Sequence, residues 1–375
     1  MRVLSVVDGV GWGGTKEQTY LIARELSKRG LEVHMAMAFQ YEEMKRKLKD
    51  YPIRLHYFEK HHRLYRFDPL NYYRLYNIIK ENKYHIVIAN SPRALDFVRV
   101  VYLFLKEKPK LIAYKRTGKG SGFLSKRLKY SIADRIVVVD KNTYERLREE
   151  GFYPERLVYI PSGLDLERFK PMGEKIGLKK KEELGIPKET RVFINVANWI
   201  PHHKGQPLLI EAFRELNCKD CILLLVGIGT AEGAKEYAKK HGLEGSLLGL
   251  GFREDLPELL SMSDFFVFAS YFEGIAGAVL QAMACEKLVI STLAGGIKDY
   301  LVDGVNGFGV EVGSLEGLIK AMRKALELPR EEIERLGKKA RATALNYSIE
   351  RTVEGYIKLF EELYGDIPVS AEQGT

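Results

Sequence analysis

The chain has 375 residues, 46% of them hydrophobic and 29% charged, which is typical of a soluble globular protein with more than one core. No run approaches the roughly 20 apolar residues that a membrane-spanning helix needs, and the first residues predict a strand rather than a secretory signal. Three cysteines are too few for a disulfide framework, so a reducing cytoplasm is the expected location.

The net charge of +9 is distributed unevenly along the chain. Residues 1–170 hold 34 Lys and Arg against 20 Asp and Glu, whereas the remaining residues hold 25 against 30. Residues 106–130 carry nine basic side chains and one acidic one. The N-terminal half is therefore expected to attract a membrane surface, a charged acceptor or nucleic acid, although a solvated lysine-rich surface explains the same composition.

Apolar, β-branched runs alternate with amphipathic segments along nearly the whole chain, which predicts two α/β domains with parallel sheets. The first series of expected strands is Val3–Val7, Val33–Ala38, Ile53–Tyr57, His85–Ala89, Leu111–Tyr114 and Ile136–Val139, with helices such as Glu17–Arg29 and Tyr72–Glu81 between them. The second series is Val192–Val196, Ile222–Val226, Ser246–Leu248, Phe265–Ala269, Leu288–Ser291 and Gly307–Val310.

A break in composition at Ile160–Pro171 and Gly173–Gly185 separates the two series. We therefore expect an N-terminal Rossmann-like domain over residues 1–170 and a second one over residues 171–347, facing each other across a cleft. The helical pattern Ile349–Tyr364 follows the second series, so residues 348–375 are expected to cross back to the first domain.

Three clusters of small residues stand between an expected strand and a helix, where open α/β sheets bind ligands. The first, Gly9-Val-Gly11-Trp-Gly13-Gly14, matches the dinucleotide fingerprint G-x-G-x-x-G. That interpretation also needs an acidic residue at the end of the second strand, and the first one there is Glu42. The alternative is a turn that lets a phosphate or sugar approach the backbone closely.

The second cluster, Asn198–Gly205, places Lys204 just before the expected helix Pro207–Leu216, an arrangement that suits a diphosphate. The third begins at Ser270 and contains Glu273, which can accept hydrogen bonds from sugar hydroxyls. Gln281 follows it by about two helical turns.

Three further features are weaker indications of function than these clusters. The pair Cys218-x-x-Cys221 lacks the two additional ligands that a zinc site needs. Asp264 is interpreted as a structural residue at the start of a strand. The basic amphipathic stretch 122–133 is compatible with a membrane interface and also with a helix that packs between elements.

Taken together, these clusters resemble the retaining family 4 glycosyltransferases of group 1, which are glycogen-synthase-like and have the GT-B fold. The resemblance covers nearly the whole chain. It rests on Gly13-Gly14, Arg29-Gly30, Ile160–Asp165, Lys204-Gly205, Gly251–Arg253, Ser270, Glu273-Gly274, Ala282–Ala284, Gly295-Gly296, Asp303–Gly307 and Tyr347-Ser348.

The resemblance implies a role for each matched residue. Lys204 would hold the donor diphosphate and Glu273 the hydroxyls of the donor sugar, as the catalytic pair. The implied donor-binding residues are Gly13, Gly14, Asn198, His203, Arg253, Ala276, Gly277, Ala278 and Gln281.

Three positions depart from the family pattern. Asn198 stands where the family usually has an arginine, and His203 or Lys16 could supply the missing cation. Gln281 replaces the second glutamate of the family's pair, and the sequence Tyr114-Lys115-Arg116 lacks the family's frequent histidine.

The expected reaction is transfer of a hexose from a nucleoside diphosphate sugar, preferably a UDP-sugar, to a hydroxyl with retention of configuration and without a metal or other cofactor. The expected acceptor is a cell-envelope glycan or glycolipid, such as a lipopolysaccharide core. It would be reached by a cytoplasmic protein at the inner face of the membrane through Lys115, Arg116, Lys119, Lys126, Arg127 and Lys129. The alternatives are a GT-B nucleotide-sugar epimerase or hydrolase and a dinucleotide-dependent oxidoreductase. A nucleic-acid partner is not expected, because no recognition motif is present.

Overall fold

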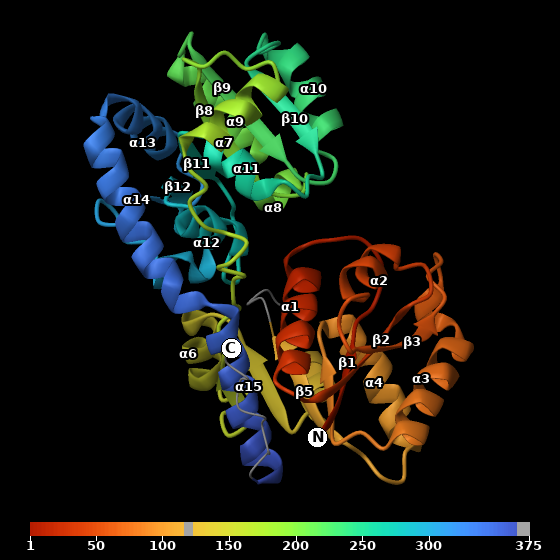
Figure 1. Cartoon of the computed structure of the whole chain (residues 1–375). Helices are drawn as coiled ribbons and strands as arrows, with labels where there is room; N and C mark the ends of the chain where they lie inside the picture. Colours follow the sequence, from red (N-terminus) through yellow and green to blue (C-terminus); the bar gives the residue numbers. More distant parts are fainter. Residues whose placement is uncertain (116–122, 366–375) are drawn as a thin grey trace, which may run out of the picture. The chain divides into compact units, whose positions relative to one another are not determined.

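The computed structural model describes residues 1–115 and 123–365, without the side chains of residues 123–126 (Figure 1). The chain divides into two compact units. Unit 1 consists of Met1–Gly163 and the segment that begins at Ile349, and unit 2 is Leu164–Ser348. The first crossing between units thus lies seven residues before the expected boundary at 170, and the second lies at the expected helix.

Unit 1 is built on a seven-stranded sheet in which every paired strand is parallel, in the order β3-β2-β1-β4-β5-β6-β7. Its strands are β1 (Arg2–Val6), β2 (Glu32–Ala38), β3 (Arg54–Glu59), β4 (Ile86–Ala89), β5 (Lys110–Lys115), β6 (Arg135–Val138) and β7 (Leu157–Tyr159). Its helices are α1 (Gly14–Lys28), α2 (Glu42–Leu48), η1 (Tyr65–Phe67), α3 (Pro69–Asn82), α4 (Pro92–Phe104), α5 (Phe123–Tyr130), α6 (Lys141–Glu149) and α15 (Ile349–Tyr364).

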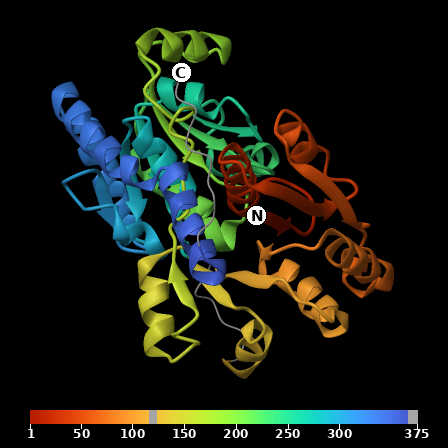
Figure 2. The same ribbon diagram turned by 60° about the horizontal axis from the view of Figure 1, so that its bottom comes forward.

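The strands of unit 1 bury both faces of the sheet, as their uninterrupted apolar runs require. Val3 and Ile86 face a core that α1, α2 and α15 cover, whereas Leu4 and Val87 face a second core under α3, α4 and α6. Helix α15 lies beside α1 in both views (Figure 1, Figure 2) and buries Val353, Tyr356 and Phe360 in the first core. The C-terminal helix therefore returns to the first unit, as predicted.

Unit 2 repeats this architecture with a six-stranded parallel sheet in the order β10-β9-β8-β11-β12-β13. Its strands are β8 (Arg191–Val196), β9 (Cys221–Val226), β10 (Leu247–Gly251), β11 (Phe265–Phe268), β12 (Leu288–Thr292) and β13 (Phe308–Val310). Its helices are α7 (Glu174–Glu183), α8 (Pro201–Lys204), α9 (Gln206–Leu216), α10 (Thr230–His241), α11 (Leu256–Met262), α12 (Gly277–Ala284), η2 (Gly295–Asp299), α13 (Leu315–Glu327), α14 (Arg330–Ala344) and η3 (Leu345–Tyr347).

Each sheet has one position where the strand order reverses direction. In unit 1 it lies between β1 and β4, and in unit 2 between β8 and β11. Loops that leave two such strands diverge to opposite sides of the sheet, so a crevice opens at the carboxyl ends of the strands, where ligands of open α/β sheets bind. The segments after β1, β4, β8 and β11 are therefore the places to look for chemistry.

All twelve predicted strands are present, and the differences from prediction are confined to short or polar elements. Strand β7 has three residues, too few for a recognisable pattern. Helix α7 forms within the stretch that was interpreted as a break, because Glu174–Glu183 is rich in lysine and glutamate, which favour helices despite their polarity.

Candidate functional site

The loops after β8 and β11 are joined by an ion pair at the switch point of unit 2. Nζ of Lys204 lies 2.6 Å from Oε1 of Glu273, and the two side chains are 19% and 9% exposed. Lys204 also lies over the ring of Phe268, at 5.7 Å from its centroid. The structure thus brings together the two predicted catalytic residues, although they are 69 positions apart in the sequence.

Lys204 is held by the short helix α8 and the glycine that follows it. Gly205 has φ of +65°, and a Cβ there would lie 2.1 Å from the carbonyl oxygen of Ala269. Only glycine fits this approach without moving the backbone. Lys204 therefore ends α8 directly against the end of β11.

His203 connects α8 to the loop that carries Glu273. The His203 carbonyl accepts the N–H of Tyr271 at 2.9 Å and the hydroxyl of Ser270 at 3.0 Å. Nε2 of His203 lies 2.5 Å from the carbonyl oxygen of Phe272, so this nitrogen carries the proton. The predicted donor-binding histidine therefore also positions Glu273.

A second glycine supports Glu273 from the loop after β12. Gly295 has φ of +56°, and a Cβ there would lie 1.9 Å from the carbonyl oxygen of Glu273. The N–H of Gly296 donates to the carbonyl of Gly274 at 2.8 Å. The Gly295-Gly296 motif thus supports Glu273 by contacting the backbone of the loop that carries it.

Helix α12 begins at this loop with its first backbone N–H groups at the carboxyl end of the sheet. Ala276 precedes it in a left-handed conformation, with φ of 50°. The hydroxyl of Tyr300, whose pKa burial raises well above its usual value, donates to the carbonyl of Ile275 at 2.7 Å and fixes this turn. Gly277 and Ala278 start the helix and are partly exposed, so their N–H dipoles point toward a region that an anion favours.

Unit 1 presents its glycine cluster in the same way, after β1 and at the start of α1. Gly13 precedes the helix, and its carbonyl accepts the N–H groups of Lys16 and Glu17. Gly14 is exposed, and a Cβ there would meet nothing within 4 Å. This surface is open to a ligand, and it belongs to a different unit from Lys204.

Family models match both units of the chain. The model "Glycosyltransferase Family 4" matches residues 12–168, and "Glycosyl transferases group 1" matches residues 178–343. The chain belongs to the family 4, group 1 glycosyltransferases. The protein is therefore a glycosyltransferase, and it has the GT-B fold.

Two sequence relatives and one solved structure show how far the likeness extends. EpsD of Bacillus subtilis (strain 168) is 28% identical over 310 residues, which are 77% of this chain and 80% of EpsD. UDP-Gal:alpha-D-GlcNAc-diphosphoundecaprenol alpha-1,3-galactosyltransferase of Escherichia coli is 27% identical over 66% of this chain and 68% of its own length. The structure of Anabaena Alr3699/HepE with UDP and glucose has a TM-score of 0.82 at 21% identity, covering 96% of this chain and all of that one.

Three other predicted donor-binding residues of this glycosyltransferase, Asn198, Arg253 and Gln281, lie in three different environments. Oδ1 of Asn198 accepts the N–H of Ile228 at 3.0 Å, so the side chain supports the loop after β9. Arg253 is held by two hydrogen bonds to Asp255, at 2.8 and 2.5 Å, and these bonds lower the pKa of that carboxyl. Gln281 lies partly exposed on α12, with no hydrogen bond to its side chain among the described residues.

The predicted basic segment of the glycosyltransferase is only partly available. Lys115 is buried at the end of β5. Arg127 donates to the carbonyl of Gly151, and Lys129 pairs with Asp96 at 2.7 Å. Arg116 and Lys119 lie outside the described residues, as does the side chain of Lys126.

An exposed surface that the sequence analysis missed follows β3 and includes the start of α3. Within residues 60–73, which we call segment 60–73, Leu64, Phe67, Leu70 and Tyr73 are 60%, 80%, 54% and 62% exposed. Lys60, Arg63 and Arg66 are exposed beside them, and Asp68 is the segment's one acidic residue. Apolar and basic residues alternate too irregularly here for a helical pattern to reveal the surface.

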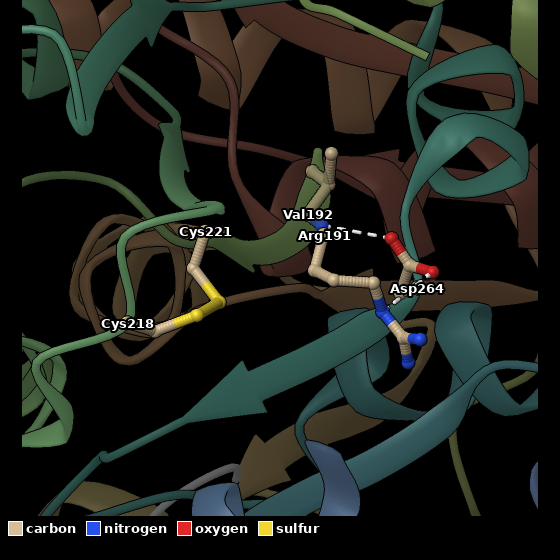
Figure 3. Close-up of a disulfide and its surroundings, with 5 residues drawn as sticks. All are labelled: Arg191, Val192, Cys218, Cys221 and Asp264. Carbon is tan, nitrogen blue, oxygen red and sulfur yellow. Dashed lines mark hydrogen bonds and ion pairs between the residues drawn. A yellow bond between two sulfur atoms is a disulfide. The ribbon is translucent and has the colours of Figure 1, made fainter. Parts of the chain in front are cut away.

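The two cysteines at the junction of α9 and β9 form a disulfide, with their Cα atoms 5.4 Å apart (Figure 3). The low cysteine count had predicted no disulfide framework, and this single bridge spans only four residues. In the same view, Asp264 accepts the N–H of Val192 at 2.8 Å and pairs with Arg191, which joins the starts of β8 and β11. Asp264 thus lies at the amino end of the sheet, in the structural position that was predicted.

Within residues 1–115 and 123–365, no group of three or more His, Cys, Asp or Glu side chains is arranged to hold a metal ion. Nor does any helix in that part of the chain have the length and apolar character to cross a membrane.

Proposed function

We propose that this glycosyltransferase moves a hexose from a UDP-sugar to a hydroxyl of a lipid-linked glycan, with retention of configuration and without a metal ion. The observation that carries the donor half of the proposal is the Lys204–Glu273 pair beside the first turn of α12. A cation, backbone N–H groups and a carboxylate are the groups that a sugar joined to a diphosphate requires.

Departure of the diphosphate breaks the bond between C1 of the sugar and the phosphate oxygen, and the electron pair stays on that oxygen. The hydroxyl oxygen of the acceptor forms the new bond to C1 on the same face, and its proton passes to the departing phosphate. Lys204 and the N–H groups at residues 276–278 would stabilise the charge that develops there. A bound diphosphate that pairs with Lys204 would also compete with Glu273 for this cation. Glu273, which is 9% exposed, would then be free to accept hydrogen bonds from the sugar hydroxyls.

The choice of a UDP-sugar is supported by the relatives. The Escherichia coli relative carries UDP-Gal in its name, and the Anabaena structure contains UDP and glucose. The first measurement is therefore a thermal-shift comparison of UDP, GDP, ADP, CMP and dTDP sugars, with NAD(P)H as a control. A shift with NAD(P)H alone would favour an oxidoreductase and contradict the proposal.

Transfer itself is measured with the radiolabelled UDP-sugar that gives the shift. Label that moves to acceptor in excess EDTA supports a metal-independent transferase. UDP release without any acceptor product would favour the hydrolase or epimerase alternative instead. The anomeric configuration of the product, read by NMR coupling constants, tests retention.

The acceptor half of the proposal rests on segment 60–73. Exposed aromatic and aliphatic side chains beside lysine and arginine are typical of a surface that enters the headgroup region of an anionic bilayer. The Escherichia coli relative has a diphosphoundecaprenol acceptor in its name, which is a membrane lipid. A protein that docks in this way would work at the cytoplasmic face of the membrane.

Vesicle sedimentation tests the membrane contact with a matched pair of variants. Phe67 and Phe104 are both exposed phenylalanines of unit 1, but only Phe67 belongs to segment 60–73. We expect the protein to sediment with phosphatidylglycerol vesicles at low salt and to be released at high salt. Phe67→Glu should weaken sedimentation, while Phe104→Glu should not, and equal behaviour of both variants would contradict the role of this segment.

A further inference from the structure

A buried carboxylate and a partly exposed imidazole form a pair at the carboxyl edge of the sheet in unit 1. Glu59 ends β3 and is fully buried. Its Oε1 lies 2.5 Å from Nδ1 of His61, and both of its oxygens accept the N–H of Gly9, at 3.1 and 3.0 Å. The pair is therefore joined to the glycine turn that follows β1.

The hydrogen bonds fix which nitrogen of His61 carries a proton. Burial raises the pKa of Glu59, and the N–H groups of Gly9 and His61 oppose that shift. A carboxylate that receives these donors acts as an acceptor, so the proton of the contact lies on Nδ1. In the neutral ring Nε2 then presents a lone pair, and within the described residues the ring has a hydrogen-bond partner on Nδ1 alone.

The ring of His61 is oriented but not enclosed. It lies 4.6 Å from the ring of Tyr65, centroid to centroid, and its Cε1 is 3.6 Å from the place where a Cβ of Gly9 would stand. The side chain is nevertheless 31% exposed. A carboxylate that holds one imidazole nitrogen while the other faces solvent is the arrangement that orients a histidine toward a ligand.

The surroundings of the pair connect two features of unit 1. On one side, Asp8 accepts the hydroxyl of Ser91, and its backbone carbonyl accepts Nζ of Lys16, at the switch point between β1 and β4. On the other side, His61 is the second residue of segment 60–73, and the exposed apolar side chains of that segment follow it along the chain. His61 thus lies between the ligand-binding edge of the sheet and the exposed basic and apolar surface.

We propose that His61, oriented by Glu59, is an acceptor-binding residue of this glycosyltransferase: its Nε2 accepts a hydrogen bond from a hydroxyl of the acceptor's terminal sugar. This inference rests on the proposed function, because it gives His61 a hydroxyl of the acceptor to bind. A sugar on a lipid carrier would bind at His61 while its carrier lies along segment 60–73.

The test measures transfer from UDP-galactose to alpha-D-GlcNAc-diphosphoundecaprenol in detergent micelles, with the full chain. His61→Ala should raise the KM for the acceptor about three- to tenfold, which is the loss of one neutral hydrogen bond. The KM for UDP-galactose should stay within about twofold, and His61→Gln, whose amide oxygen can replace Nε2, should recover part of the loss. His241→Ala is the control, since His241 is a partly exposed histidine of unit 2, outside segment 60–73.

Two kinetic outcomes would overturn the inference. One is an acceptor KM in His61→Ala that stays within about twofold of the wild-type value. The other is a parallel rise of both KM values together with a lower melting temperature, which would indicate that His61 only supports the Gly9 turn.

Failure of the proposed function gives a different result. If the wild-type protein transfers no galactose to this acceptor, the assignment of the donor fails, and binding of the acceptor alone is then followed by NMR of ¹⁵N-histidine-labelled protein. The His61 imidazole signal, identified by its absence in His61→Ala, should move when the lipid-linked sugar is added. A signal that stays in place would overturn the inference.

Discussion

Replacing Lys204 by alanine tests the donor site most directly, because the change removes Nζ, the atom that is proposed to hold the donor diphosphate. The change removes the cation 2.6 Å from Glu273 and leaves that carboxylate, which is 9% exposed, without its partner. Removal of one preorganised donor to a developing oxyanion costs about 10²- to 10³-fold in kcat, or ~2.7–4 kcal/mol of transition-state stabilisation. The UDP-induced thermal shift should also shrink, since the same cation would hold the diphosphate.

The same change also affects stability, and the two effects must be separated. An unpaired, mostly buried carboxylate should lower the free energy of unfolding by about 1–2 kcal/mol, less than for a fully buried pair because Lys204 is partly exposed. In Lys204→Ala/Glu273→Gln the uncompensated charge is absent, so the melting temperature should recover while turnover remains low. Lys235→Ala, an exposed lysine of unit 2, is the control.

Turnover is measured as acceptor-dependent UDP release at saturating donor. A kcat in Lys204→Ala within about tenfold of the wild-type value, in protein that melts normally, would refute the role given to the cation. So would a double variant that regains turnover along with stability, because Lys204 would then serve only to neutralise Glu273.

Three further predictions concern the backbone, the pH dependence and the disulfide. Gly205→Ala should lower both the melting temperature and turnover, because its Cβ would lie 2.1 Å from a carbonyl oxygen; Gly14→Ala, where a Cβ meets nothing, should leave the melting temperature unchanged in the absence of ligand. Burial, with His34 and Arg54 nearby, lowers the pKa of His56 to about 4. The unfolded chain therefore binds more protons below pH 6.5, so the free energy of unfolding should fall between pH 6.5 and 4, by roughly 1–2 kcal/mol after solvent screening, in denaturant titrations; a stability that is flat across this range would contradict the burial. Reduction of the disulfide should cost about 2 kcal/mol or less in calorimetry, because its loop has only four residues, and should leave turnover unchanged, because the bridge lies at the amino end of β9.

The sequence predicts the sheets of this protein well because both are parallel and buried on two faces. Each strand must then be an apolar, β-branched run, and such runs stand out from the amphipathic helices between them. Helix α7 escaped prediction for the opposite reason. Seven of its ten residues are charged, and what marks it as a helix is propensity alone.

For the site, the sequence indicates which residues take part but not how they are joined. Lys204 and Glu273 each follow a strand, and only the adjacency of β8 and β11 in the sheet brings them to 2.6 Å. The Glu59–His61 pair had no motif to mark it, since its contact with Gly9 spans 50 positions. The available indication of this pair in the sequence was an acidic residue, Glu59, at the end of a strand.

Charge counting does not show which charges of a segment are available for binding. The nine basic residues of 106–130 predicted a binding surface, yet Lys129 is neutralised by Asp96, more than thirty positions away. The composition gives the number of charges in a segment. Whether a charged side chain is available to bind a ligand depends on the partners that the fold places beside it. Segment 60–73 has a single acid, and its Lys60, Arg63 and Arg66 are exposed.

The return of α15 to unit 1 has a consequence for how the protein is made. Residues 1–163 leave the ribosome long before Val353, Tyr356 and Phe360, the side chains that complete their first core. Unit 2, by contrast, is a single continuous stretch, and it is fully synthesised before α15 appears. During synthesis, the later half of the chain can thus finish folding while the earlier half still exposes an apolar face beside α1, which is where a nascent-chain chaperone would act.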